Sequence, residues 1–336
     1  MGHAAGVHAP EARLPRERRI ARRRILKGVP PLRFGEGHDC TFPASLAMAS
    51  KTDYDWVMGC SAIAFTTTID AAGWDPLAAV PSDPQTRERA ARALGLRLDE
   101  VSPPYDDEMR SLVGERVAEA IDTELPPLVR GLGGPPEYGL LVGYDETVPV
   151  FFARTFFDRT DEPRRVGWEA FENESRGTPI FLDRATPPDR AEAVRAGIDA
   201  GLTAGDVTDN ALASWAEAVR DDARWSDTKH AGTAAFADHA MRAILVDKRR
   251  AAARFLRSSR GLFPNAPGAD LLRAAESFGY GAEVAAKGGL GEFDGGVAMR
   301  FLDVGHRRAW AKNLDAVREH DREAREALAA ARTGMR

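Results

Sequence analysis

Cysteine is scarce in this chain of 336 residues, which contains only Cys40 and Cys60. Two cysteines cannot build the disulfide scaffold that stabilises small secreted domains, and they fit a reducing compartment. No apolar run approaches the roughly 20 residues that a membrane-spanning helix needs. We therefore expect a cytoplasmic protein with no membrane partner.

Metal-binding patterns are also missing. No Cys-x-x-Cys motif is present, and the histidines have unsuitable spacings. His230 and His239 would point to opposite sides of one helix, and His306 and His320 would lie about 21 Å apart along another. We expect neither a metal ion nor any other cofactor.

The charge is acidic except at the start of the chain. The first 30 residues contain eight Lys or Arg and two Asp or Glu, a balance of +6. Because the whole chain has a net charge of −5, the remaining residues have a net charge of about −11. An acidic body argues against a nucleic-acid partner. No apolar segment follows the arginines, so they do not form a secretory signal. We predict that residues 1–28 are a disordered basic tail.

The chain is too long for one ordinary hydrophobic core, and we predict two domains. Residues 29–186 mix strand and helix signals, which favours an α+β fold. After Pro187 and Pro188 the pattern is helical, and residues 187–333 are predicted to form a helical bundle.

Within the first domain, the spacing predicts a short helix over residues 41–50, capped by Asp39 or Cys40, with Pro43 in its first turn. Three closely spaced strands over residues 128–132, 138–144 and 148–152 indicate an antiparallel meander. The cap and proline at Asp83-Pro84 predict the start of another helix.

Cys40 is the candidate nucleophile. A thiol reacts as its thiolate, which is only about 3% populated at pH 7 for an ordinary cysteine. The free amides and dipole at a helix start favour the anion, and Cys40 is predicted at such a start. The alternative is that Cys40 is a small buried side chain.

Four segments resemble the papain-like cysteine-peptidase fold in its C39-like and butirosin-biosynthesis-protein-H-type forms. The match covers residues 28–183 and comprises the Asp-Cys-Thr-Phe start of the predicted helix, residues 54–59, residues 134–145 and residues 168–171. Their order along the chain makes the resemblance more specific than any one motif.

The resemblance implies that Cys40 is the nucleophile. The family's catalytic histidine is replaced by Glu137, so Glu137 or the nearby His38 would have to act as the base, with Asp158 near the place of the orienting residue. A carboxylate beside a thiol raises its pKa, so this dyad is degraded. Asp39, Tyr138 and Trp56 belong to the matching segments and are expected to contact the substrate; core packing is the alternative for both aromatic residues.

Two functions follow. The first is acyl transfer from a carrier-protein thioester, or hydrolysis of a thioester or amide, since a thioester needs a weaker base than a peptide does. Ordinary peptidase activity is not expected. The second is a non-catalytic relative that binds a small molecule or peptide in the former peptidase cleft. The helical domain is also a candidate surface for homo-oligomer formation.

Overall fold

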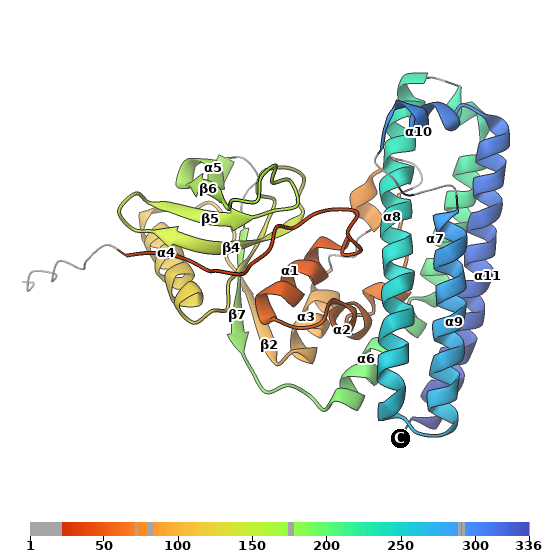
Figure 1. Ribbon diagram of the computed structural model, residues 1–336, viewed down its shortest axis with the longest axis horizontal. Coiled ribbons are helices and arrows are strands. Elements are labelled where there is room, and N and C mark those ends of the chain that lie inside the picture. Colours follow the sequence, from red (N-terminus) through yellow and green to blue (C-terminus); the bar gives the residue numbers. More distant parts are fainter. Residues whose placement is uncertain are drawn as a thin grey trace, which may run out of the picture.

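An α+β region precedes a helical region in the computed structural model (Figure 1), which confirms the predicted fold class. The structure describes residues 22–70, 73–79, 83–173, 178–226, 228–287, 290 and 293–335. No helix in these ranges is long and apolar enough to cross a membrane.

In these ranges the sheet has seven strands, and all paired neighbours are antiparallel. The strands are β1 (Arg23–Ile25), β2 (Leu96–Glu100), β3 (Leu128–Arg130), β4 (Tyr138–Asp145), β5 (Val150–Arg154), β6 (Arg164–Gly167) and β7 (Thr178–Arg184). Their order is β2-β7-β3-β4-β5-β6, and β1 pairs with β4 beyond the residues that β3 pairs. The predicted meander is therefore confirmed as β3, β4 and β5.

Helices cover both faces of this sheet. The helices of the α+β region are α1 (Thr41–Ser50), α2 (Tyr54–Cys60), α3 (Pro84–Ala93), α4 (Asp107–Asp122) and α5 (Trp168–Asn173), with 3-10 turns η1 (Ile63–Phe65) and η2 (Pro76–Ala79). Leu140 and Val142 of β4 belong to the core that contains α1, whereas Leu141 and Tyr144 belong to the core that contains α4. Because each face is covered, β4 is buried along its whole length.

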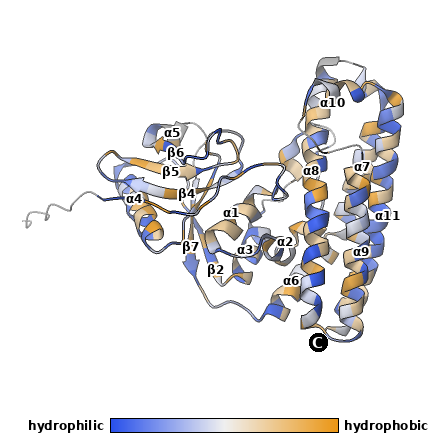
Figure 2. Ribbon diagram, viewed as in Figure 1, coloured by the Kyte–Doolittle hydropathy of each residue, from blue (hydrophilic) through white to orange (hydrophobic). Residues whose placement is uncertain are grey.

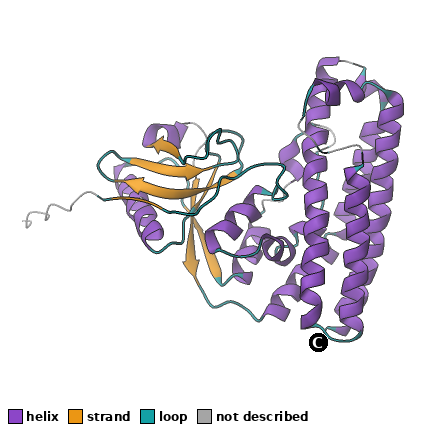
Figure 3. Cartoon of the chain, viewed as in Figure 1, coloured by secondary structure: helices purple, strands orange, loops and turns teal. Residues whose placement is uncertain are grey.

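The helical region is a bundle of long helices. Its elements are α6 (Arg190–Thr203), α7 (Gly205–Arg220), η3 (Asp222–Trp225), α8 (Thr228–Ser259), η4 (Arg260–Leu262), α9 (Ala266–Ala286), α10 (Gly295–Arg300) and α11 (Val304–Gly334). Helices α8, α9, α11 and α7 pack side by side (Figure 3). Apolar and polar residues alternate along them (Figure 2), as expected of helices that bury one face.

The bundle shares its hydrophobic core with α1 and α2. Helix α2 packs closely on α8 and α6 because both contacts involve glycine. A Cβ atom on Gly59 would lie 2.2 Å from Cγ of Phe255, and one on Gly197 would lie 2.3 Å from the carbonyl oxygen of Gly59. The secondary structure changes from sheet to bundle at Pro187 and Pro188, while the hydrophobic core of α1 and α2 continues into the bundle.

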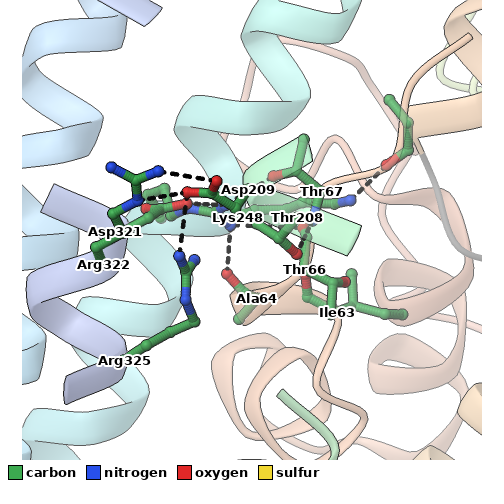
Figure 4. Close-up of polar contacts among 12 residues, drawn as sticks. Ile63, Ala64, Thr66, Thr67, Thr208, Asp209, Lys248, Asp321, Arg322 and Arg325 are labelled. Atoms are coloured by element: carbon green, nitrogen blue, oxygen red, sulfur yellow. Dashed lines mark hydrogen bonds and ion pairs between the residues drawn. The ribbon is translucent and has the colours of Figure 1, made fainter. Parts of the chain in front are cut away.

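A buried arginine also joins the two regions. Arg249 of α8 and Asp321 of α11 are fully buried and lie 2.6 Å apart. Arg249 also donates to the carbonyl of Ala64 at 2.9 Å and to the hydroxyl of Thr67 at 2.6 Å. Figure 4 shows Ala64, Thr67 and Asp321 gathered at this contact. The segment after α2 is thereby held against the bundle.

The prediction of a disordered tail over residues 1–28 is wrong for part of its C-terminal end. Arg23–Ile25 form β1, and Arg22 donates to the carboxylates of Asp122 and Glu146, at 2.7 and 3.0 Å. Arg22, Arg23 and Arg24, which were assigned to the tail, each have a carboxylate partner. Residues 1–21 lie outside the described residues.

Candidate functional site

Helix α1 begins as its sequence predicts, with Cys40 as the N-cap residue and Thr41 as the first helical residue. The Cys40 side chain makes no capping hydrogen bond. Pro43 lies in the first turn, where its missing N–H is not needed. The predicted span of residues 41–50 is confirmed.

The Cys40 side chain is fully buried, with 0% of the residue exposed. Burial raises the pKa of the Cys40 thiol far above its ordinary value, and the charge of Asp247 acts in the same direction. Lys248 opposes this increase but does not cancel it. This is the reverse of the effect expected from a helix start, because desolvation of the thiolate outweighs the helix dipole.

Tyr54 and Asp247 connect the start of α1 to the bundle. The backbone N–H of Cys40 donates to the hydroxyl of Tyr54 at 3.3 Å, and this hydroxyl donates to Oδ2 of Asp247 at 2.5 Å. The backbone N–H of Asp39 donates to the same oxygen at 3.0 Å. One carboxylate oxygen of α8 thus holds groups from both α2 and the segment before α1.

Asp247 and Lys248 were missed by the sequence analysis. Burial raises the pKa of Asp247 to about 7 and lowers that of Lys248 to about 8. The Lys248 ammonium donates to the carbonyl of Ala79. The available signal was four consecutive charged residues, Asp247 to Arg250, between apolar residues of one helix; such a run cannot lie wholly on a solvated face.

Glu137 also lies at the start of α1. The hydroxyl of Thr41 donates to the Glu137 carboxylate, and the backbone N–H of Tyr138 donates to the Thr41 hydroxyl at 3.3 Å. Burial raises the pKa of Glu137, and the bond from Thr41 partly offsets this increase. The first residues of β4 are therefore joined to the residue next to Cys40, while the hydrogen bond of Glu137 goes to Thr41.

Asp158 and His38 each contact a residue other than Cys40. The Asp158 carboxylate accepts hydrogen bonds from the backbone N–H and the hydroxyl of Thr155, at 2.9 and 2.8 Å. The exposed His38 ring packs against the Tyr54 ring, with 4.6 Å between centroids. These contacts hold the turn after β5 and cover Tyr54.

The residues assigned to substrate contact are largely buried. Trp56 packs against Phe255 with 5.7 Å between ring centroids, and the Arg190 guanidinium lies 4.0 Å from its ring centroid. Tyr138 packs edge-on against Phe42. Both aromatic residues are buried. Asp39 accepts from the backbone N–H of Gly35 at 2.6 Å, and burial raises its pKa.

A pocket of about 580 Å³ opens beside these residues, between α1, the segment that precedes it, and α2. We call it the α1 pocket. Its wall includes Ala44, Ala47 and Met48 of α1, together with His38, Asp53, Tyr54, Asp55, Phe156 and Arg254. His38 is thus a pocket residue, whereas Cys40 lies behind the wall.

Charged groups in the pocket wall are mostly paired. Arg254 contacts the Asp55 carboxylate at 2.6 and 2.7 Å, and the Asp53 carboxylate caps α2 through the backbone N–H of Trp56. No group of three His, Cys, Asp or Glu side chains suited to a metal ion occurs among the residues that the structure describes. The site offers apolar surface and hydrogen-bonding groups.

A scan against protein-family models gives no match, and no curated protein sequence matches this chain.

Proposed function

We propose that the chain binds a small molecule or a peptide in the α1 pocket without covalent chemistry at Cys40. One observation carries this proposal: Cys40 is 0% exposed and its thiol pKa is raised, while a pocket of about 580 Å³ lies beside it. A nucleophile must reach its substrate and be ionised in useful amount. The pocket itself is in the size range of small-ligand sites.

The polar contacts support the same proposal. A general base must come within hydrogen-bond reach of the proton that it removes. The Glu137 hydrogen bond is made with Thr41, and the His38 ring lies against Tyr54. Each candidate base is therefore engaged by a neighbour of Cys40.

The wall chemistry indicates an amphipathic ligand. Ala44, Ala47 and Met48 offer apolar surface along one side of α1, while His38 and Asp53 lie in the same wall. An apolar ligand group would pack on α1, and a polar group would bond to the rim. Both a peptide side chain and a small molecule meet this description.

Methionine methyl NMR tests this proposal directly. Met48 lines the pocket, whereas Met299 of α10 is 65% exposed and belongs to a different element. A mixture of hydrophobic dipeptides and drug-sized fragments is expected to shift the Met48 methyl resonance and leave that of Met299 unchanged.

Two variants make the test specific. Ala47→Phe places a ring in the pocket and is expected to abolish the Met48 shift, whereas Cys40→Ser is expected to retain it. Leu112→Phe, at an exposed site of α4, controls for an added ring. Equal shifts of Met48 and Met299, or no shift with any probe, would contradict the proposal.

Cysteine-dependent acyl transfer is the second candidate. The observation in its favour is that Cys40 stands at the helix start and Glu137 at the start of β4, joined through Thr41. This arrangement matches what the resemblance to the papain-like fold implies for nucleophile and base. In this reaction the Cys40 sulfur would bond to the thioester carbonyl carbon, the carrier thiol would leave with the proton, and an amine or water would then release the acyl group.

Alkylation distinguishes the two candidates. With iodoacetamide between pH 5 and 9, we expect Cys40 to react more than about tenfold more slowly in the folded protein than in urea. Rapid alkylation of Cys40 below pH 8, or an acyl adduct after incubation with a small acyl thioester, would favour acyl transfer.

We also propose a reducing, cytoplasmic setting, supported by two cysteines that are free and buried.

A further inference from the structure

We infer that Asp247 is a positioning residue for the α1 pocket: it fixes the wall formed by Tyr54 and the segment before α1, and it makes ligand binding depend on pH. This inference rests on the proposed function for its ligand, but its structural part can be measured without one.

One oxygen of Asp247, a residue that does not itself line the pocket, binds two segments of the pocket wall. Oδ2 of Asp247 accepts from the Tyr54 hydroxyl at 2.5 Å and from the backbone N–H of Asp39 at 3.0 Å. Tyr54 lines the pocket, and Asp39 follows directly after the pocket residue His38. A helix of the bundle therefore sets the position of two wall segments that lie about 200 residues earlier in the chain.

The second oxygen of Asp247 is unusual. Oδ1 is buried and has no hydrogen-bond partner among the described residues, and only 3% of Asp247 is exposed. An unpaired buried carboxylate oxygen is costly when the group is ionised, and protonation relieves that cost. The site can thus exist with or without a proton while Oδ2 keeps both of its donors.

Charged and titratable groups surround Asp247 on several sides. Asp39 and Cys40 face it from the segment before α1, and Tyr54 faces it from α2. Lys248 and Arg254 are on α8 itself. Burial is the main cause that raises the Asp247 pKa to about 7; Asp39 adds to the increase, while Arg254 and the bonds from Tyr54 and Asp39 oppose it.

The proton changes how firmly the wall is held. An ionised carboxylate accepts stronger hydrogen bonds than a neutral acid. Tyr54 and the Asp39 amide are therefore held more firmly above pH 7 than below it. If the difference is that between an ordinary and a charge-assisted bond, a ligand that needs the fixed wall binds about fivefold more tightly at pH 8 than at pH 6.

Carbon-13 NMR of tyrosine tests the structural part. The Tyr54 Cζ resonance is expected to move with a midpoint near pH 7, together with the carboxyl resonance of Asp247. The step should vanish in Asp247→Asn, which keeps the size and an acceptor oxygen. Because the His38 ring also packs on Tyr54, the titration is repeated in His38→Gln, where the step should persist.

The outcomes separate the two proposals. A Tyr54 step that survives in Asp247→Asn and vanishes in His38→Gln, or no step at all, overturns the role of Asp247. The probe concentration that half-saturates the Met48 shift is measured at pH 6 and at pH 8. Equal values at the two pH values overturn the pH dependence. Failure of every probe to shift Met48 overturns the proposed function, while the Tyr54 titration still decides the role of Asp247.

Discussion

The hydroxyl of Thr41 donates a hydrogen bond to the carboxylate of Glu137, and this contact joins the start of α1 to the start of β4. The same hydroxyl accepts the backbone N–H of Tyr138. The Thr41 hydroxyl, next to Cys40 in the chain, thus bonds to both Glu137 and Tyr138 at the start of the strand. Thr41 and Glu137 both belong to segments, or lie beside segments, that carry the resemblance to the papain-like fold.

Removal of the Thr41 hydroxyl should destabilise the fold. In Thr41→Val the half-buried Glu137 carboxylate loses its donor, and a hydrogen bond of this kind contributes about 0.5–1.5 kcal/mol. Thr41→Ser keeps the hydroxyl and is the matched control. Urea unfolding at pH 7 measures the difference, and equal stability of the Val and Ser variants would show that the bond contributes nothing.

Glu137→Gln should remove a pH dependence. Burial raises the folded-state pKa of Glu137 above its unfolded value, so its contribution to stability is full below the unfolded pKa and is lost as pH rises through the folded pKa. The wild type should therefore lose stability relative to Glu137→Gln as pH rises from 4 to 8. Parallel curves of unfolding free energy against pH would contradict this expectation.

The buried ion pair should be far more important than an exposed one. Asp321→Asn leaves the fully buried Arg249 without its counter-ion, and breaking such a pair costs about 3–5 kcal/mol. Asp315→Asn, on the same helix, removes a pair with Arg220 in which both side chains are more than 40% exposed. The control should cost less than about 1 kcal/mol by urea unfolding.

Asp238 should make the bundle less stable as pH rises. Its Oδ1 accepts from the indole N–H of Trp215 at 2.7 Å and that of Trp310 at 3.0 Å. Burial raises the pKa of Asp238 to about 6 from an ordinary 3.8, so the stabilising neutral form is lost as pH rises through about 6.

Asp238→Asn keeps an acceptor for both indoles and cannot ionise. Relative to this variant, the wild type should lose up to about 3 kcal/mol of unfolding free energy between pH 4 and pH 7, as 1.36 kcal/mol corresponds to one pKa unit. Tryptophan fluorescence follows the unfolding. A constant difference between the two proteins across this range would refute the assignment.

Two glycine substitutions should have opposite effects. Gly59→Ala places a Cβ atom 2.2 Å from Phe255 and should cost about 1–3 kcal/mol by overpacking. Gly114→Ala is in α4, where nothing lies within 4 Å of the added atom, and should stabilise by about 0.5–1 kcal/mol. Thermal unfolding compares them, and a neutral Gly59→Ala would mean that α2 can move away from α8.

Local sequence signals predicted the elements that carry strong caps or regular patterns. Helix α1 was found from its cap position and from Pro43 in its first turn, and strands β3 to β5 were found because turn residues separate short apolar runs. Strands β1 and β6 were missed because Arg23-Arg24 and Arg164-Arg165 give no apolar alternation. An edge strand held by backbone pairing needs little apolar surface, so its composition resembles that of a loop.

The candidate site was predictable only in part for a similar reason. Cys40 and Glu137 belong to local patterns, and the structure places both at the start of α1. Asp247 and Lys248 reach the same place from a helix about 200 residues away. The pKa of Cys40 depends on that burial, which no local pattern encodes.

The shared core of α1, α2 and the bundle has a consequence for dissection of the chain. A fragment that ends at β7 would leave the outer sides of both helices, including Trp56 and the surroundings of Cys40, exposed to water. Such a fragment would have an aggregation-prone apolar surface and a Cys40 thiol exposed to solvent. Reactivity measured on it would describe the cut surface and not the intact protein.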